Sequence, residues 1–177
     1  MATRPASHAP REQFLFIMMP VLFLGVLTDQ VSKSWASLGA AEPRILVPGY
    51  LAAYSVPNAG SILGFGNDQA RTAPILALLG IVCSVLLMRI GYLDRSRWRR
   101  ADCLACALLL AGIIGNIVDR VALGHVRDFL VTWAIPTLIF NVADLLMVAV
   151  GAALLMARVC NRKQTGSDLG LIRCETA

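Results

Sequence analysis

The sequence is poor in charged residues. Asp, Glu, Lys and Arg make up 15% of the 177 residues, whereas apolar residues make up 57%. Soluble domains usually carry about a quarter charged residues. The composition therefore indicates a membrane protein or an unusually apolar soluble core. The length of the apolar segments decides between them, because a membrane-spanning helix needs about 20 mostly apolar residues.

Histidine is scarce as well, with only His8 and His125 in the chain. A serine triad or a histidine-rich metal site would lack its base or its ligands, and no G-x-S-x-G motif is present. We interpret His125 as a polar loop residue. The sequence also has no H-E-x-x-H motif, P-loop or Rossmann fingerprint. These absences argue against serine, zinc-peptidase and nucleotide chemistry.

The five cysteines predict no disulfide framework, because their number is odd and most lie in apolar segments. Cys103 and Cys106 form a C-x-x-C pair that has neither a second pair nor a histidine partner. A zinc or redox site is the alternative. Packing as small apolar side chains is the favoured interpretation.

Four apolar segments are long enough to cross a bilayer. They cover about residues 14–35, 73–93, 101–121 and 138–160. Because four crossings with short connections use nearly the whole chain, we predict one all-α integral membrane domain over residues 1–177. The first segment is not expected to be a cleaved signal peptide, since no small-x-small site follows it and its helical pattern continues through Asp29 and Lys33.

Basic residues gather in particular connections. Arginine is frequent in the loop between the second and third segments and at both chain ends, whereas residues 36–70 contain a single basic residue, Arg44. Cationic loops stay in the cytoplasm. We therefore predict cytoplasmic termini, with a cytoplasmic tail at residues 161–177 and outward connections after the first and third segments. The net charge of +5 then favours contact with anionic phospholipids and not with nucleic acid.

The connection at residues 36–70 mixes short β-like runs with Pro and Gly breaks. We predict a small outer platform there, with at most three short strands. The second outer connection, "VALGHVRDFLVTWAIPTLIF", is too polar and proline-broken at its start to be helical throughout. In the third segment, Gly112 and Gly115 are expected to permit close helix approach.

Polar side chains within or beside membrane segments are costly and mark candidate functional positions. The predicted topology puts one such set at the outer face: Asp29, Lys33, Asn116, Asp119, Arg120, Asp128, Asn141 and Asp144. Asp29 and Lys33 are four residues apart and can pair. An ion pair that merely closes the first helix is the alternative. Asp119 and Arg120 could equally serve only to join two helices.

Asp128 and Asp144 have no obvious local base except Arg127, which alternation along an extended segment would turn away from Asp128. Two neighbouring carboxyl groups cannot both ionise easily, so one pKa rises and the pair shares a proton. The ionised acid can then take a proton from water while the protonated acid polarises a carbonyl, as peptide hydrolysis requires. A spacing of sixteen residues supports this chemistry only weakly by itself.

Five sequence blocks, in order, supply a stronger indication. They are "TDQVSK", "NAGSILG", "GNIVDR", "GHVRDF" and "FNVAD". Together they resemble the D-Q-x-x-K, N-x-G, G-N-x-x-D-R, V-x-D-F and F-N-x-A-D blocks of the lipoprotein signal peptidases, the type II signal peptidases of bacteria. The resemblance covers about residues 14–158.

The resemblance implies an aspartyl endopeptidase with Asp128 and Asp144 as its catalytic pair and with no metal or cofactor. The implied substrates are prolipoproteins carrying a diacylglyceryl group on the lipobox cysteine, cut just before that cysteine. The implied location is the bacterial cytoplasmic membrane, as a monomer with its active site at the outer face. The supporting positions that would hold the substrate, orient the acids or stabilise the site are Asn58, Gly60, Gly112, Asn116, Asp119, Arg120, Asn141, Asp29 and Lys33.

The chain departs from this family pattern at several points. Ala111 stands where a glycine is common, and Arg127 stands where an apolar residue is usual and could lower the pKa of Asp128. The interval between the two acids is slightly short. These departures bear on substrate preference more than on the reaction. The alternative that the protein is a specialised paralogue stays open. A transporter that uses the acids as a proton relay and an inactive scaffold for lipidated peptides remain alternatives.

Overall fold

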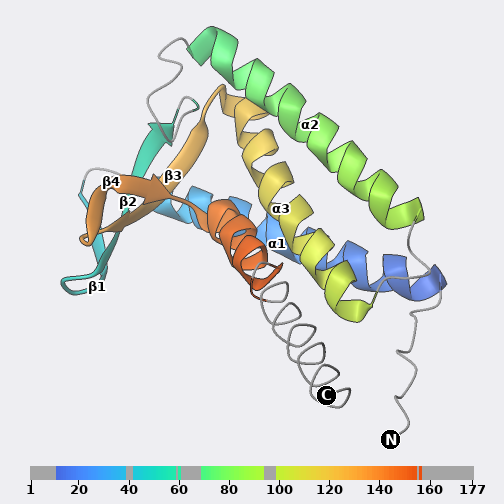
Figure 1. The fold of residues 1–177 in the computed structure, drawn as a ribbon. Helices are drawn as coiled ribbons and strands as arrows, with labels where there is room; N and C mark the ends of the chain where they lie inside the picture. The colour runs from blue at the N-terminus through green and yellow to red at the C-terminus, as the bar shows by residue number, and fades with distance from the viewer. Residues whose placement is uncertain are drawn as a thin grey trace, which may run out of the picture. The chain divides into compact units, whose positions relative to one another are not determined.

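The computed structural model describes residues 11–38, 42–58, 60, 69–93, 99–154 and 156 (Figure 1). The predicted tail at residues 161–177 and the end of the fourth predicted segment lie outside the described residues. The chain divides into two compact units, Met1–Met147 and Val148–Ala177. All of the candidate site residues belong to the first unit.

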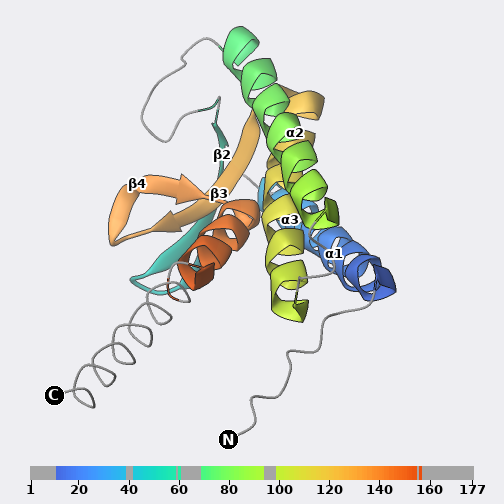
Figure 2. The ribbon, with the colours of Figure 1, turned by 45° about the vertical axis from the view of Figure 1, so that its right-hand side comes forward.

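Three long helices confirm the first three predicted segments: α1 (Arg11–Ser37), α2 (Gln69–Leu93) and α3 (Arg100–Leu123). Each is long and apolar enough to cross a membrane. α3 packs against α1 on one side and α2 on the other (Figures 1 and 2). Large apolar side chains of α2 remain exposed, among them Ile75 at 64% and Val85 at 60%. Such a surface suits contact with lipid rather than water.

The fourth apolar segment begins as a strand. The sequence predicted a helix from residue 138, but β4 (Ile135–Phe140) continues to Phe140 and the helix described next is Val142–Leu154. Phe140 pairs with Leu130 and Ile139 pairs with Val131 of the neighbouring strand. A short apolar run fits a buried strand as well as a helix, so hydrophobicity alone does not set this boundary. The described part of the chain therefore has three candidate membrane spans.

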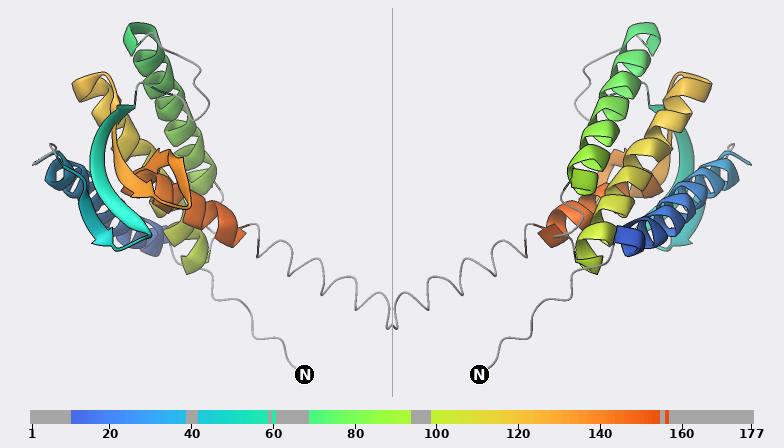
Figure 3. Two further views of the ribbon diagram at one scale, coloured as in Figure 1. Left: turned by 90° about the vertical axis from the view of Figure 1, so that its left-hand side faces the viewer. Right: turned by 90° about the vertical axis from the view of Figure 1, so that its right-hand side faces the viewer.

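A four-stranded antiparallel sheet joins the two predicted outer connections. It consists of β1 (Arg44–Val47), β2 (Leu51–Asn58), β3 (Val126–Thr132) and β4, in the order β1-β2-β3-β4. The sequence predicted a platform confined to residues 36–70, and that boundary is wrong because β3 pairs with β2 along most of its length. The register shifts between Ala53 and Val56, and the strands bend visibly (Figure 3).

The sheet is fixed to the C-terminal ends of α1 and α3. Ala36, near the end of α1, packs against Ala53 of β2 and Phe129 of β3. α3 ends at Gly124, whose φ of 76° is left-handed and whose N–H donates to the carbonyl of Arg120 at 3.1 Å. Glycine adopts this conformation without a Cβ penalty. β3 starts two residues later, which places Asp128 close to the end of α3.

Glycines allow α3 to approach its neighbours closely, as predicted for Gly112 and Gly115. A Cβ on Gly112 would lie 2.6 Å from the carbonyl oxygen of Ala143, and one on Gly115 would lie 2.5 Å from a carboxyl oxygen of Asp29. Ala111, which stands where a glycine is common in the sequence pattern, faces a glycine on α1. A Cβ on Gly25 would lie 2.6 Å from that of Ala111. The close packing of α1 with α3 therefore depends on glycine at position 25.

Gly115→Ala is expected to lower the free energy of unfolding by about 1–3 kcal/mol, the usual cost of overpacking. The added methyl group would push against Asp29, which neighbouring elements hold in place. Gly151→Ala is the matched control, since none of the described residues has an atom within 4 Å of a Cβ added there. Thermal unfolding in detergent should show a lower Tm for the first variant only. Equal Tm values for the two variants would contradict this packing.

Candidate active site

Polar side chains from five parts of the chain meet where the sheet joins the helices. They are Asp29 and Lys33 of α1, Asn58 of β2, Asn116, Asp119 and Arg120 of α3, Asp128 of β3, and Asn141 and Asp144 at the start of the last helix. Asp29, Lys33, Asp119 and Asn141 have no exposed surface. All of the polar residues chosen from the sequence therefore belong to one cluster, and three of its charged side chains, Asp29, Lys33 and Asp119, are fully buried.

Asn141 and Asp144 cap the start of the last helix. The backbone N–H of Asp144 donates to the Asn141 side-chain oxygen at 3.0 Å, and the backbone N–H of Asn141 donates to Asp144 Oδ2 at 3.1 Å. This reciprocal pair is a capping box, which satisfies N–H groups that a helix start leaves unpaired. The spacing of the two residues thus fixes the position of the Asp144 carboxyl group.

Asp128 accepts hydrogen bonds from two neutral amides. Asn141 Nδ2 donates to Oδ1 and Asn58 Nδ2 donates to Oδ2, both at 2.6 Å. The carboxyl group is 3% exposed. Burial raises the pKa of Asp128 to about 6, and repulsion from Asp144 adds to this rise, against the opposing effect of the two amides and of Lys33. Asn141 therefore links the two acids, since it bonds to both.

Gly60 supports Asn58 directly. Its backbone N–H donates to the Asn58 side-chain oxygen at 2.9 Å, which leaves the Asn58 amide nitrogen for Asp128. The φ of Gly60 is 143°, and an added Cβ would lie 2.6 Å from Thr72 and 2.7 Å from Leu76. Glycine is thus the residue that fits at position 60.

Lys33 orients Asn116, and Asn116 in turn holds Asp144. Lys33 Nζ donates to the Asn116 side-chain oxygen at 3.0 Å and pairs with Asp29 at 2.8 Å. The oxygen of Asn116 also accepts from Asn141 Nδ2 at 3.1 Å, so its amide nitrogen is left to donate to Asp144 Oδ1 at 2.9 Å. A buried cation therefore fixes the direction of an amide that contacts one of the two acids.

Asp29 does more than close an ion pair with Lys33. Its Oδ1 accepts from the backbone N–H of Ala143 at 2.9 Å, in the first turn of the last helix. The acid thereby ties that helix start to α1, and its negative charge suits the N-terminal end of a helix. Gln30, which the sequence analysis did not assign, donates to the carbonyl of Gly115 at 3.0 Å.

Arg127 turns away from Asp128, as the alternation of an extended segment predicts. Its guanidinium group donates to Asp119 Oδ1 at 2.7 Å and to Gln30 at 2.8 Å, and its backbone N–H donates to Asp119 Oδ2 at 2.9 Å. The guanidinium group thus pairs with Asp119, and the causes of the raised pKa of Asp128 are burial and the neighbouring Asp144. The alternation of β3 was visible in the sequence, but the partner of the arginine was not.

Asp119 pairs with Arg127 and also lies 3.5 Å from Lys33. Asp119 therefore joins α3 to α1 and to β3, which fits the alternative that it links elements of the fold. Arg120 instead interacts electrostatically with all three acids Asp119, Asp128 and Asp144. Its Nη1 donates to the carbonyl of Asn116 at 3.4 Å, while its buried Nε has no hydrogen-bond partner among the described residues.

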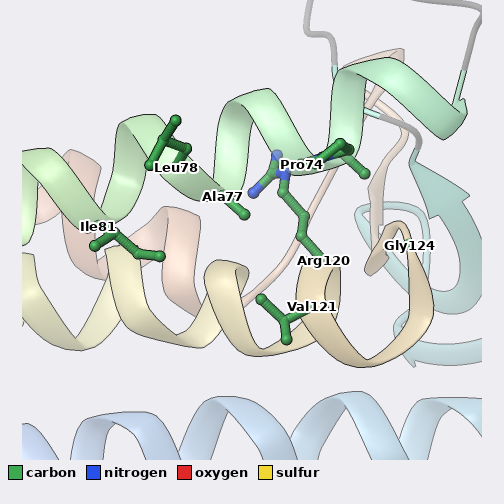
Figure 4. A pocket seen from close by; sticks show the side chains of 8 residues that line it. Pro74, Ala77, Leu78, Ile81, Arg120, Val121 and Gly124 are labelled. Atoms are coloured by element: carbon green, nitrogen blue, oxygen red, sulfur yellow. The ribbon is translucent and has the colours of Figure 1, made fainter.

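An apolar hollow lies between α2 and α3. Its volume is about 420 Å³, and its lining residues are Ala73, Pro74, Ala77, Leu78, Ile81, Arg120, Val121 and Gly124. Figure 4 shows the Arg120 side chain extending from α3 toward α2, near Pro74 and Ala77. The hollow thus combines apolar walls with one cation that also faces the acids.

The C-x-x-C pair packs in the hydrophobic core. Cys103 and Cys106 are buried free thiols in a cluster with Met18, Ala107 and Leu110. Their surroundings are those of small apolar side chains, which agrees with the packing interpretation.

Arg127→Leu is expected to destabilise the fold by about 2–3 kcal/mol, because it removes charged hydrogen bonds from the buried Asp119. Lys33 would then move toward Asp119 and release Asn116, so the rate of the reaction should fall together with stability. Arg127→Lys should recover part of both. Arg100→Leu, at an exposed position in the first turn of α3, is the control. Unchanged unfolding of Arg127→Leu in detergent would refute the stabilising role of this contact.

Known proteins share both sequence and fold with this chain. A family model described as signal peptidase (SPase) II matches residues 21–161. The lipoprotein signal peptidase of Pseudomonas syringae pv. tomato is 34% identical over 175 residues, which cover 92% of this chain and 95% of that protein. That of Pseudomonas fluorescens is 36% identical over 159 residues, covering 82% and 89%.

The fold also has a solved counterpart. A structure described as a bacterial membrane enzyme aligns with a TM-score of 0.74 at 23% identity, covering 85% of this chain and 92% of that one. The helices and the polar cluster thus belong to a membrane-embedded peptidase. The chain is a member of the signal peptidase II family, the lipoprotein signal peptidases.

Proposed function

We propose that Asp128 and Asp144 are the catalytic pair of an aspartyl endopeptidase. The observation that carries this proposal is a contrast between two kinds of acid in one cluster. Asp29 and Asp119 are each neutralised by a close cation. In the described part of the chain, the hydrogen bonds to Asp128 and Asp144 come from amide groups alone. These two acids therefore keep the basicity and the proton that hydrolysis needs.

The charge balance supports a shared proton. Four carboxyl groups, from Asp29, Asp119, Asp128 and Asp144, lie among three cations, from Lys33, Arg120 and Arg127. Because an uncompensated buried charge is costly, one acid is favoured to stay protonated. The raised pKa of Asp128 supports a proton on that residue, with Asp144 as the acid that acts on water.

The two acids then divide the reaction between them. Asp128 donates a hydrogen bond and then its proton to the scissile carbonyl oxygen, while Asp144 takes a proton from water and the water oxygen attacks the carbonyl carbon. The resulting diol collapses as the carbon–nitrogen bond breaks. The proton on Asp144 passes to the leaving nitrogen, and Asp128 recovers its proton from the diol hydroxyl. Asn58, Asn116 and Asn141 hold the two carboxyl groups in place throughout.

The proposed substrates are prolipoproteins that carry a diacylglyceryl group on the lipobox cysteine. Cleavage just before that cysteine releases the signal peptide. Two features support this class: the relatives named above are lipoprotein signal peptidases, and an apolar hollow between α2 and α3 is lined in part by Arg120 of the polar cluster. The hollow would accept an acyl chain and Arg120 would meet polar substrate groups. A tethered substrate also reaches the acids already aligned.

The proposed topology has four crossings, with both termini in the cytoplasm and the sheet and site at the outer face. The arginine-rich loop between α2 and α3 supports a cytoplasmic position for that connection. The sheet adjoins the C-terminal ends of α1 and α3, and the arginine-rich loop adjoins the N-terminal end of α3. The sheet would therefore lie on the side of the membrane opposite to that loop. The segment after β4, residues 142–157, is mostly apolar and would supply the fourth crossing. We propose that the protein acts as a monomer among membrane phospholipids.

The substrate class is tested with purified protein and two forms of one precursor, with and without the diacylglyceryl group. Only the lipid-modified form should be cut, and mass spectrometry should place the cut immediately before the modified cysteine. Equal cleavage of both forms would contradict the proposed substrate. Binding of the modified precursor without any cleavage would favour the scaffold alternative.

Activity should depend on pH through Asp128. Below its pKa of about 6 the acid carries the proton, and above it the proton is lost. The value of kcat/KM should therefore fall as pH rises through this range, by up to about tenfold per unit. Thermal unfolding at each pH separates this loss from denaturation. A flat profile between pH 5 and pH 8 would refute the assigned protonation state.

A further inference from the structure

The two connections that build the sheet are almost free of charge. Residues 45–67 contain no Asp, Glu, Lys or Arg, and neither do residues 129–143. Sheets exposed to water usually protect their edges with charged residues, especially lysine. A sheet with so few charges and with large exposed apolar side chains instead indicates contact with another apolar phase.

Exposed apolar side chains gather where the two hairpin turns of the sheet meet. The backbone N–H of Trp133, after β3, donates to the carbonyl of Tyr50, before β2, at 3.1 Å. Tyr50 is 74% exposed, Ile135 53%, Trp133 49% and Val47 46%. These four residues form the sheet tip. It lies at the opposite end of β3 from the α3 junction (Figure 1).

The apolar surface of the sheet continues that of α1. Trp35 and Leu38, at the end of the first candidate membrane span, are 41% and 72% exposed. Arg44 of β1 stacks over the Trp35 ring at 4.9 Å and donates to the carbonyl of Leu38. The next residue, Ile45, is 64% exposed. In Figures 1 and 2 the sheet extends sideways from the C-terminal end of α1, so lipid around this end would reach β1.

We propose that the sheet tip inserts into the headgroup region of the bilayer that α1 crosses. Trp and Tyr favour this zone because their rings are apolar at one end and polar at the other. Arg44, the cation at the junction of helix and sheet, lies where lipid phosphates would meet it. The partner is bulk phospholipid, not a bound substrate. Because Asp128 lies on β3 with the tip at its far end, this contact fixes the depth of the acid in the membrane.

Depth-resolved fluorescence tests the insertion independently of activity. The chain has three tryptophans, Trp35, Trp98 and Trp133, and Phe at the first two leaves Trp133 as the only one. In vesicles whose lipids carry bromine near the headgroup, the emission of this residue should fall well below its value in vesicles without bromine, because an interfacial indole lies at that depth. It should also be shielded from aqueous iodide. A variant that keeps only Trp35 provides the positive control.

The opposite result is equally clear. Quenching by iodide without quenching by brominated lipid would overturn the insertion. Shielding that disappears on dilution into excess lipid would assign the tip to a second copy of the chain and would also overturn it. If the double replacement fails to fold, the difference in quenching between wild type and Trp133→Phe reports on the same residue. None of these readings requires cleavage, so failure of the proposed function leaves the test intact.

Discussion

Asp128→Asn and Asp144→Asn are each expected to reduce cleavage of a lipid-modified precursor by about 10⁴-fold, the upper range for a lost general acid or base. Asn at position 144 keeps an oxygen that can accept the backbone N–H of Asn141, so the capping box survives. The loss should therefore appear in kcat while the protein still folds and inserts. Initial rates in vesicles, with substrate above KM, measure it.

Asp102→Asn is the matched control for these variants. Asp102 is an exposed acid that accepts the backbone N–H of Arg99 at 2.8 Å in the capping box of α3. The same chemical change there should leave the rate near that of the wild type. Cleavage retained by either site variant would remove that acid from the mechanism. Equal losses in all three variants would show that the assay reports membrane insertion instead of chemistry.

The stability of Asp128→Asn should also show that the ionised form of Asp128 destabilises the folded protein. A pKa raised from 3.8 to about 6 means that the folded protein binds the proton more tightly than the unfolded chain does. This contribution to stability is complete below pH 4 and is lost as pH rises to 6, at about 3 kcal/mol in total. Asn avoids that loss but gives up one acceptor. The variant should therefore gain stability relative to wild type between pH 4 and pH 8.

Lys33→Met is expected to be the most destabilising single change at the site. Lys33 is fully buried and lies within 3.5 Å of both Asp29 and Asp119. Removing one partner of a buried ion pair typically costs about 3–5 kcal/mol, because the remaining charge is left uncompensated. Asn116 would also lose the donor that orients it toward Asp144. Both the free energy of unfolding and the rate of cleavage should therefore fall sharply.

Lys163→Met removes the other lysine of the chain and controls for the loss of a positive charge. It should keep the wild-type Tm and rate. Solvent denaturation in a fixed detergent compares the variants. Lowering the pH should partly restore the stability of Lys33→Met, because protonation of Asp29 removes the uncompensated charge. A surface ion pair contributes up to about 1 kcal/mol to the free energy of unfolding. If Lys33→Met lowers that free energy by no more than this, Lys33 does not act as a buried ion-pair partner.

The helices were predictable because apolar length is a local property of the sequence. Residues 73–93 and 101–121 agree with α2 and α3 to within a few residues. The sheet was only half predicted, since pairing of β2 with β3 joins segments separated by two helices. The start of the last helix was misplaced for the same reason. Residues 138–140 are apolar in either state, and only their pairing with β3 makes them a strand.

The membership of the polar cluster was predictable, but its connections were not. Spacing identified Asp29 and Lys33 as a pair, yet gave no sign that Asp29 would bond to Ala143 or that Lys33 would orient Asn116. Arg127 was expected to face away from Asp128, but its partner, Asp119 of α3, was not expected. Side-chain partners depend on how elements cross, and the crossing here depends on contacts such as that of Gly115 with Asp29.

The central claim is that Asp128 and Asp144 act as one catalytic unit, and the double variant Asp128→Asn/Asp144→Asn tests it most directly. Residues that work as a unit show strongly non-additive losses. The double variant should therefore cleave the lipid-modified precursor no more slowly than either single variant, within about the error of the assay. Losses that multiply would mean that the two acids act in independent steps, and would contradict the shared-proton mechanism.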